Sequence, residues 1–167
     1  ILMRDWGASE KYNHTSWGGN FRLESLQASF LRIKLRELKT WTQERERIAG
    51  VYRQTLNPDC LMGPITQESS HVFHIFAITV RNREEFCDHL SQNQIGFGFH
   101  YPKAIHEQPA YASQVLTPVS LSNAEYLAKT TISLPLFPGQ SDREVNKVIE
   151  NVNQGLKKPQ NYWNTYS

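Results

Sequence analysis

The first candidate site is a short polar segment, Gly18-Gly19-Asn20-Phe21-Arg22. Glycine has no Cβ atom, so two adjacent glycines let the backbone come close to a ligand. The amide of Asn20 offers a donor and an acceptor, and the forked guanidinium of Arg22 matches a carboxylate or a phosphate. The simpler alternative is a glycine turn leading into a helix. A cation is disfavoured in the first turn of a helix, and this favours an anionic partner for Arg22.

A second candidate site follows Gly96-Phe97-Gly98 and contains His100, Tyr101 and His106. Imidazole and phenol groups in a loop bounded by Pro102 could hydrogen-bond a polar substrate or transfer protons. Two histidines six residues apart around a proline cannot share one face of a helix, which argues against a zinc site. The alternative is a surface loop in which a histidine packs on a tyrosine.

A further pair of histidines, His71 and His74, lies in a stretch rich in β-branched and aromatic residues. Residues three apart on a strand point to opposite faces, so the two should not bind one ion, and one pointing inward is more often a core histidine. Cys60 and Cys87 belong to no Cys-x-x-Cys or Cys/His cluster, which argues against a disulfide framework and a structural zinc site. We therefore expect no metal site and a reducing cytoplasm.

A long helix must position the first site. Residues 1–22 show no sustained apolar period and are predicted to be irregular, facing a ligand or a partner. From Leu23 to Leu56 apolar residues recur at spacings of three, four and seven, which predicts one helix ended by Asn57-Pro58. Such a helix, roughly 30 residues and about 45 Å long, suits a strut between two domains.

The second site is predicted to lie in a compact α+β unit with a small three-stranded sheet. The predicted strands, rich in β-branched and aromatic residues or bounded by prolines, cover residues 71–80, 95–100 and 131–134. The predicted domains are an interface segment with the connecting helix, the α+β domain, and a tail, at residues 1–56, 57–158 and 159–167.

Helices are predicted from their start signals. Asn82 is a predicted N-cap for a helix over residues 83–92. Ser141-Asp142-Arg143-Glu144 is a capping box for a helix that Gly155 ends. Short helical turns are expected at residues 109–114 and 122–129.

Composition narrows the class of protein. The chain has 167 residues, 39% of them hydrophobic and 20% charged, which is typical of a soluble globular domain. A formal net charge of +2 argues against a nucleic-acid partner. No apolar run approaches the roughly 20 residues of a membrane span. The chain begins Ile1-Leu2-Met3, without an initiator methionine, and we expect it to be a fragment.

Taken in order, these segments resemble the DegT/StrS-type sugar aminotransferases, a branch of the fold-type I enzymes that depend on pyridoxal phosphate (PLP). The family's Gly-x-Asn-aromatic-Arg pattern stands at residues 18–22, before Leu26-Gln27-Ala28. Its His-aromatic-His strand, glycine-rich strand with a His-Tyr-Pro loop, and late proline turn stand at residues 71–74, 96–102 and 134–138. The resemblance reaches about Gly155 and implies the small C-terminal domain of a fold-type I aminotransferase with its connecting helix. With over half of such a subunit missing, the exposed face of the helix from Leu23 to Leu56 is expected to be unusually apolar and to favour self-association.

The resemblance also implies roles for single residues. Asn20 is expected to reach the phosphate of a neighbouring subunit's PLP, and Arg22 a carboxylate of the substrate or amino donor. His100, Tyr101 and His106 are expected to border the sugar pocket. The implied protein is a cytoplasmic homodimer that moves an amino group from glutamate or glutamine to a keto-sugar, expected to be nucleotide-linked.

The resemblance places the Schiff-base lysine, the aspartate that pairs with the pyridine nitrogen and the aromatic residue stacked on the ring upstream of the matched region. None of five lysines that we considered occupies the matching segment: Lys11, Lys34, Lys39, Lys103 and Lys129. We therefore expect no catalytic residue in this chain and no PLP bound to it alone. One alternative is a non-catalytic remnant that serves as a dimerisation or small-molecule-binding module. Another is a pseudo-enzyme that completes another subunit's site through Asn20.

Overall fold

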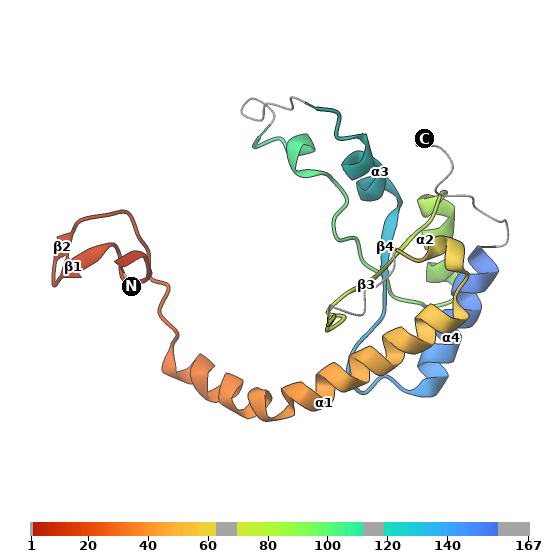
Figure 1. Cartoon of the computed structure of the whole chain (residues 1–167), viewed down its shortest axis with the longest axis horizontal. Coiled ribbons are helices and arrows are strands. Elements are labelled where there is room, and N and C mark those ends of the chain that lie inside the picture. Colours follow the sequence, from red (N-terminus) through yellow and green to blue (C-terminus); the bar gives the residue numbers. More distant parts are fainter. Residues whose placement is uncertain (1, 63–69, 112–118, 157–167) are drawn as a thin grey trace. The chain divides into compact units, whose positions relative to one another are not determined.

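The chain folds into two units. The computed structural model describes residues 2–62, 70–111 and 119–156, and contacts divide the chain into residues 1–40 and 41–167. The long helix α1, Ser25–Thr55, begins in the first unit and ends in the second (Figure 1). Its bounds agree with the predicted helix to within two residues at each end, and the α+β class predicted from the sequence is confirmed.

The first unit opens with a small antiparallel hairpin. A 3-10 turn at Leu2–Arg4 leads into β1, Ala8–Glu10, which pairs with β2, Asn13–His14. The prediction that residues 1–22 are irregular is therefore wrong for this stretch. Strands this short cannot display the alternation by which a strand is recognised in a sequence.

The second unit is built on two antiparallel strands. In β3, Phe76–Thr79, and β4, Thr131–Leu134, the register pairs Phe76 with Leu134 and Ile78 with Ile132. These four side chains are all buried and lie at alternate positions of their strands, so they form one apolar face of the sheet. Full burial of each such side chain contributes about 1.5–3 kcal/mol.

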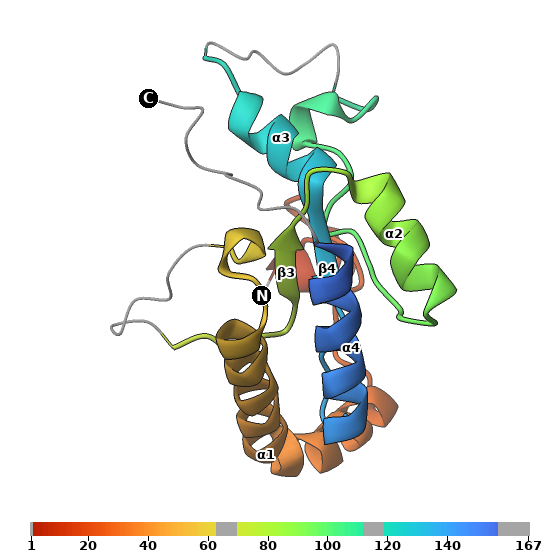
Figure 2. The same ribbon diagram turned by 90° about the vertical axis from the view of Figure 1, so that its right-hand side faces the viewer.

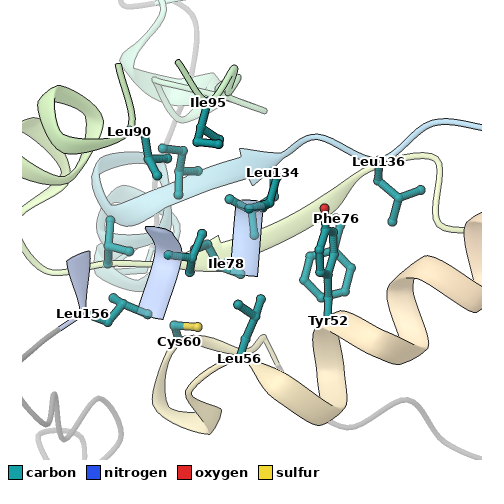
Figure 3. Packing of buried hydrophobic residues seen from close by; sticks show 14 of the residues in the cluster. Tyr52, Leu56, Cys60, Phe76, Ile78, Leu90, Ile95, Leu134, Leu136 and Leu156 are labelled. Atoms are coloured by element: carbon teal, nitrogen blue, oxygen red, sulfur yellow. The ribbon is translucent and has the colours of Figure 1, made fainter. Parts of the chain in front are cut away.

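Helices cover this apolar face. The C-terminal half of α1 supplies Ile48, Tyr52 and Leu56 to the core, and the Tyr52 ring meets Phe76 edge-on at 5.1 Å (Figure 3). Helix α2, Arg83–Gln92, lies beside α4, Asp142–Gly155 (Figure 2). Helix α3, Ser122–Thr130, runs directly into β4.

The predicted caps of two helices are confirmed. The Asn82 side chain accepts a hydrogen bond from the backbone N–H of Glu85. Ser141 and Glu144 form the reciprocal capping box of α4, which ends at Gly155 as expected. Each cap satisfies backbone donors that have no partner within the helix.

Two predicted strands are shorter than expected. The strand predicted over residues 71–80 starts only at Phe76, because Phe73 has a left-handed backbone with φ of 49°, which breaks the extended run. The strand predicted over residues 95–100 is reduced to a single bridge between Gly98 and Ser133. In the described part of the chain, the sheet of this unit therefore has two strands, with Gly98 bridging to β4 and Leu61 bridging to β3.

The remaining segments lie in loops. A 3-10 turn at Ile105–Glu107 precedes the turn in which Tyr111 donates its N–H to the Gln108 carbonyl at 2.9 Å. Residues 112–114 of the predicted turn and the predicted tail lie outside the described residues. No helix among the described residues is both long and apolar enough to cross a membrane.

Candidate functional site

The first candidate site lies just after the hairpin, where the chain comes back beside Arg4 and Asp5. Asp5 and Asn20 form an antiparallel bridge, and Phe21 donates its N–H to the Arg4 carbonyl at 2.9 Å. The backbone on both sides of Asn20 is thereby fixed. Asn20 itself is exposed.

Glycines make this close return possible. A Cβ atom on Gly18 would lie 2.4 Å from the backbone nitrogen of Gly7, and one on Gly7 would lie 1.7 Å from the Ser16 carbonyl oxygen. Gly7 also has a φ of 70°, a conformation that glycine adopts without steric cost. The close approach at Gly18 is thus to the chain's own backbone.

Arg22 orients the amide of Asn20. The Nε–H of Arg22 donates to Oδ1 of Asn20 at 3.2 Å, and Nε lies 3.8 Å from Oδ1 of Asp5. A guanidinium can only donate, so the carbonyl side of the amide must face it and the Nδ2 amino group must face away. Within the described residues, Nδ2 of Asn20 and the terminal nitrogens of Arg22 make no hydrogen bond. Both groups are therefore open to a ligand.

The second candidate site lies beside β4. Nδ1 of His100 is 2.9 Å from the hydroxyl oxygen of the buried Ser133, and Tyr101 meets the His100 ring edge-on at 5.6 Å. The Tyr101 side chain is 72% exposed, and its hydroxyl has no hydrogen-bond partner in the described part of the chain. The two residues therefore present an imidazole and a phenol to solvent from one loop.

His106 is held differently. Its Nε2 atom lies 3.0 Å from a carboxylate oxygen of Glu125 in α3, and the His106 side chain is only 16% exposed. Among the described residues, no hydrogen bond or ring contact joins it to His100 or Tyr101. The structure thus pairs His100 with Tyr101 and ties His106 to a helix.

Ser133 is the residue that the sequence alone did not reveal. Its strand was predicted correctly, and strand alternation places it on the face opposite Ile132 and Leu134. The missing information was the bridge to Gly98, which brings His100 over that face and cannot be read from local pattern.

In the described part of the chain, neither the other pair of histidines nor the two cysteines form a reactive site. His71 and His74 are both exposed, and the chain is not yet a strand at either position, so neither is a core histidine. Burial raises the pKa of the Cys60 thiol to about 12 and also raises the pKa of Cys87, so neither forms a ready thiolate. Among the described residues, no three His, Cys, Asp or Glu side chains are grouped to hold a metal ion.

Solved structures define the class to which this fold belongs. The fold matches S. venezuelae DesV with a TM-score of 0.84 and 31% identity, over 95% of this chain and 43% of that one. It matches a DegT DnrJ EryC1 StrS aminotransferase from Brucella abortus with a TM-score of 0.84 and 25% identity, over 94% of this chain and 42% of that one. The architecture is that of part of a fold-type I sugar aminotransferase.

The amino-acid sequence also matches a known protein family. Residues 1–153 match the DegT/DnrJ/EryC1/StrS aminotransferase family, and the chain belongs to it. The resemblance stated from the motifs is confirmed.

Several curated relatives carry transaminase names. The chain is 36% identical to the dTDP-3-amino-3,6-dideoxy-alpha-D-galactopyranose transaminase of Aneurinibacillus thermoaerophilus, over 92% of this chain and 42% of that protein. It is 34% identical to the dTDP-3-amino-3,4,6-trideoxy-alpha-D-glucose transaminase of Streptomyces venezuelae, over 94% of this chain and 42% of that protein. The chain thus spans about 42% of the length of these relatives, in their C-terminal portion.

Proposed function

We propose that this chain is the C-terminal portion of a PLP-dependent aminotransferase that moves an amino group from glutamate or glutamine to a nucleotide-linked keto-sugar. Membership of the family and relatives named as transaminases of dTDP-linked amino-sugars support the proposal. PLP, when bound, supplies the electron sink for amino transfer. The observation that carries the proposal furthest is the Arg22–Asn20 hydrogen bond, which leaves an amide donor open beside a cation.

The proposed role of Asn20 is to donate Nδ2–H to the phosphate of a PLP held by a neighbouring subunit. Phosphate oxygens accept hydrogen bonds, and neutral donors backed by a positive charge suit them. Asn20 meets both requirements, because Arg22 fixes the amide and its guanidinium lies within hydrogen-bond distance. The residues present therefore fit the group.

Arg22 is proposed to bind a carboxylate of the donor or substrate through its terminal nitrogens. Its Nε–H is already used by Asn20. The two terminal nitrogens form the end of the guanidinium fork that matches a carboxylate with two parallel hydrogen bonds. Half of the Arg22 side chain, 54%, is exposed.

The proposed sugar-binding residues are His100, Tyr101 and His106. Sugar hydroxyls both donate and accept, and an exposed phenol does the same, so Tyr101 suits them directly. Because His106 is held by Glu125, its proposed part is to border the pocket through its Nδ1 edge.

We propose that the Schiff-base lysine lies in the part of the relatives' length that this chain does not span, and that the chain alone is inactive. The test is to mix the chain with PLP, reduce with borohydride and locate any lysine adduct by mass spectrometry. We expect no stoichiometric adduct at a single lysine. One lysine labelled to completion would overturn this part of the proposal.

A homodimer is proposed because the first half of α1 carries large exposed apolar side chains. Leu26, Phe30 and Ile33 share one helix face and are 70%, 59% and 64% exposed, in agreement with the apolar face that the family resemblance implied. Contiguous exposed apolar patches mark interaction sites. We propose that the rest of the subunit and a second subunit cover this helix in the whole enzyme.

The same exposed helix favours the alternative function, a non-catalytic dimerisation module. Coding DNA directly upstream of Ile1 separates the two. An in-frame continuation that encodes the lysine segment supports the enzyme, and a stop codon supports the module.

We further propose a cytoplasmic location, supported by two free cysteines. We also propose that the chain consists of an interface segment with the connecting helix, an α+β domain and a tail, divided near residues 56 and 158.

A further inference from the structure

The ring of His100 lies against the polar face of the two-stranded sheet. Gly98 and Ser133 exchange two backbone hydrogen bonds, with N···O distances of 3.1 and 2.8 Å, which bring the loop after Gly98 alongside β4. Strand alternation turns the Ser133 hydroxyl away from the apolar core. The hydroxyl oxygen and Nδ1 of His100 are then 2.9 Å apart.

The direction of this hydrogen bond follows from counting protons. Within the described residues, the Ser133 hydroxyl has no partner besides Nδ1 of His100, and Ser133 is only 6% exposed. If Nδ1 carried the imidazole proton, Ser133 would accept it and its own O–H would be left without an acceptor. A buried donor left unsatisfied costs about 1–3 kcal/mol. The favourable arrangement has Ser133 donating and Nδ1 accepting.

We propose that Ser133 is a positioning residue that holds His100 as its Nε2–H tautomer. A neutral imidazole that accepts at Nδ1 must carry its proton on Nε2. Nε2 makes no hydrogen bond in the described part of the chain, and His100 is exposed. The ring therefore presents a neutral donor to whatever binds beside it.

The Nε2–H tautomer determines which ligand groups His100 can bind. Nε2–H can donate to a carbonyl, hydroxyl or phosphate oxygen, but it cannot accept a proton or meet an ammonium group. His100 is thus a binding residue for an acceptor oxygen and not a general base. That this oxygen belongs to a sugar rests on the proposed function, whereas the tautomer itself does not.

Gly98 leaves the space that the ring occupies. A Cβ atom at Gly98 would lie 3.1 Å from Cε1 of His100, closer than ordinary van der Waals contact. The ring would have to shift by a few tenths of an ångström to admit it, which disturbs its 2.9 Å contact with Ser133. Gly98→Ala therefore provides a second way to weaken the contact without touching either partner.

The test is ¹⁵N NMR of the imidazole rings of the whole chain in mildly alkaline buffer, where imidazoles are neutral. The spectrum of a His100→Gln variant identifies the His100 signals among the six histidines. For His100 we expect the Nε2–H tautomer to exceed the Nδ1–H tautomer at least about fivefold. That excess should fall in Ser133→Ala and Gly98→Ala and persist in Ser133→Thr, which keeps a hydroxyl.

A predominant Nδ1–H form in the unaltered chain would overturn the proposal, whether or not any variant folds. An excess unchanged by Ser133→Ala, in a variant whose amide spectrum keeps the native dispersion, would also overturn it. A separate titration with a dTDP-linked sugar, in the enzyme that contains this chain, addresses the ligand. If the tautomer is as expected but no His100 shift accompanies binding, the proposed sugar role of His100 fails while the role of Ser133 stands.

Discussion

Arg22 holds the side chain of Asn20 by a hydrogen bond from its Nε–H to the Oδ1 oxygen, at 3.2 Å. Two residues that the sequence pattern places two apart therefore act as one unit, in which the cation fixes which face of the amide is open. In the proposed enzyme this unit meets the cofactor phosphate and a carboxylate. Substitution of Asn20 and of Arg22 tests the two roles separately.

The first prediction concerns Arg22. In an enzyme that contains this chain, Arg22→Gln should raise KM for the amino donor about tenfold or more, because a charge-assisted hydrogen bond contributes about 1.5–3 kcal/mol. Steady-state kinetics with varied glutamate measures the change. Arg4→Gln is the matched control, since Arg4 is exposed in the same segment and contributes only its backbone carbonyl. Equal effects of both substitutions would contradict a specific role for Arg22.

The second prediction separates two adjacent glycines. Gly18→Ala should disrupt the hairpin, because the added Cβ would lie 2.4 Å from backbone, whereas at Gly19 the nearest atom, at 2.9 Å, is the tip of the movable Phe21 ring. Amide NMR spectra should show shifts across residues 5–20 for Gly18→Ala and local shifts for Gly19→Ala. The reverse order of effects would refute the close backbone approach at Gly18.

The third prediction concerns the start of α4. Ser141→Ala should lower the free energy of unfolding by about 0.5–2 kcal/mol, the usual cost of losing an N-cap. Hydrogen bonds from Ser141 also hold the pKa of Glu144 below its ordinary value of 4.5. Stability from Glu144 is therefore present above that value and lost as pH falls through the lower folded pKa. Urea unfolding against pH should show a shallower acid loss in Glu144→Gln; an unchanged slope would contradict the coupling.

The fourth prediction concerns alkaline pH. Burial raises the pKa of Tyr52 from 10.0 to about 12 and that of Cys60 from 9.0 to about 12. The unfolded chain releases these protons first, so stability is full below about pH 9 and falls as pH rises toward 12. Tyr52→Phe should flatten part of this fall in thermal unfolding. It should also cost about 1–3 kcal/mol at neutral pH, because the Pro135 carbonyl and Gln140 amide lose their partner.

The fifth prediction concerns self-association through α1. The chain should sediment as a dimer or larger species at micromolar concentration, and Leu26→Glu combined with Ile33→Glu should make it monomeric, because both changes put charge on one exposed apolar face. Arg32→Glu is the control, since Arg32 lies on a different face of the helix. A monomer before any substitution would contradict association through this face.

What the sequence predicted correctly depended on local signals. The caps at Asn82 and Ser141 and the break at Asn57-Pro58 are set by neighbouring residues, and the helices they bound appear where expected. The hairpin at residues 8–14 was missed because its strands are too short to show an alternating pattern. The strand expected at residues 95–100 is only a bridge at Gly98, and its pairing depends on the distant Ser133. The same holds within the sites. Residue types identified His100, but its contact with Ser133 joins positions 33 residues apart.

The central claim, that this chain completes a sugar aminotransferase, is tested most directly by one assay. The chain is expressed together with the coding sequence that precedes it in frame, and is supplied with PLP, glutamate or glutamine, and a dTDP-linked keto-sugar. Mass spectrometry then follows the sugar. The account predicts conversion to the amino-sugar, with a large loss of rate in Asn20→Ala. A keto-sugar left unchanged by a folded, PLP-loaded protein would contradict it.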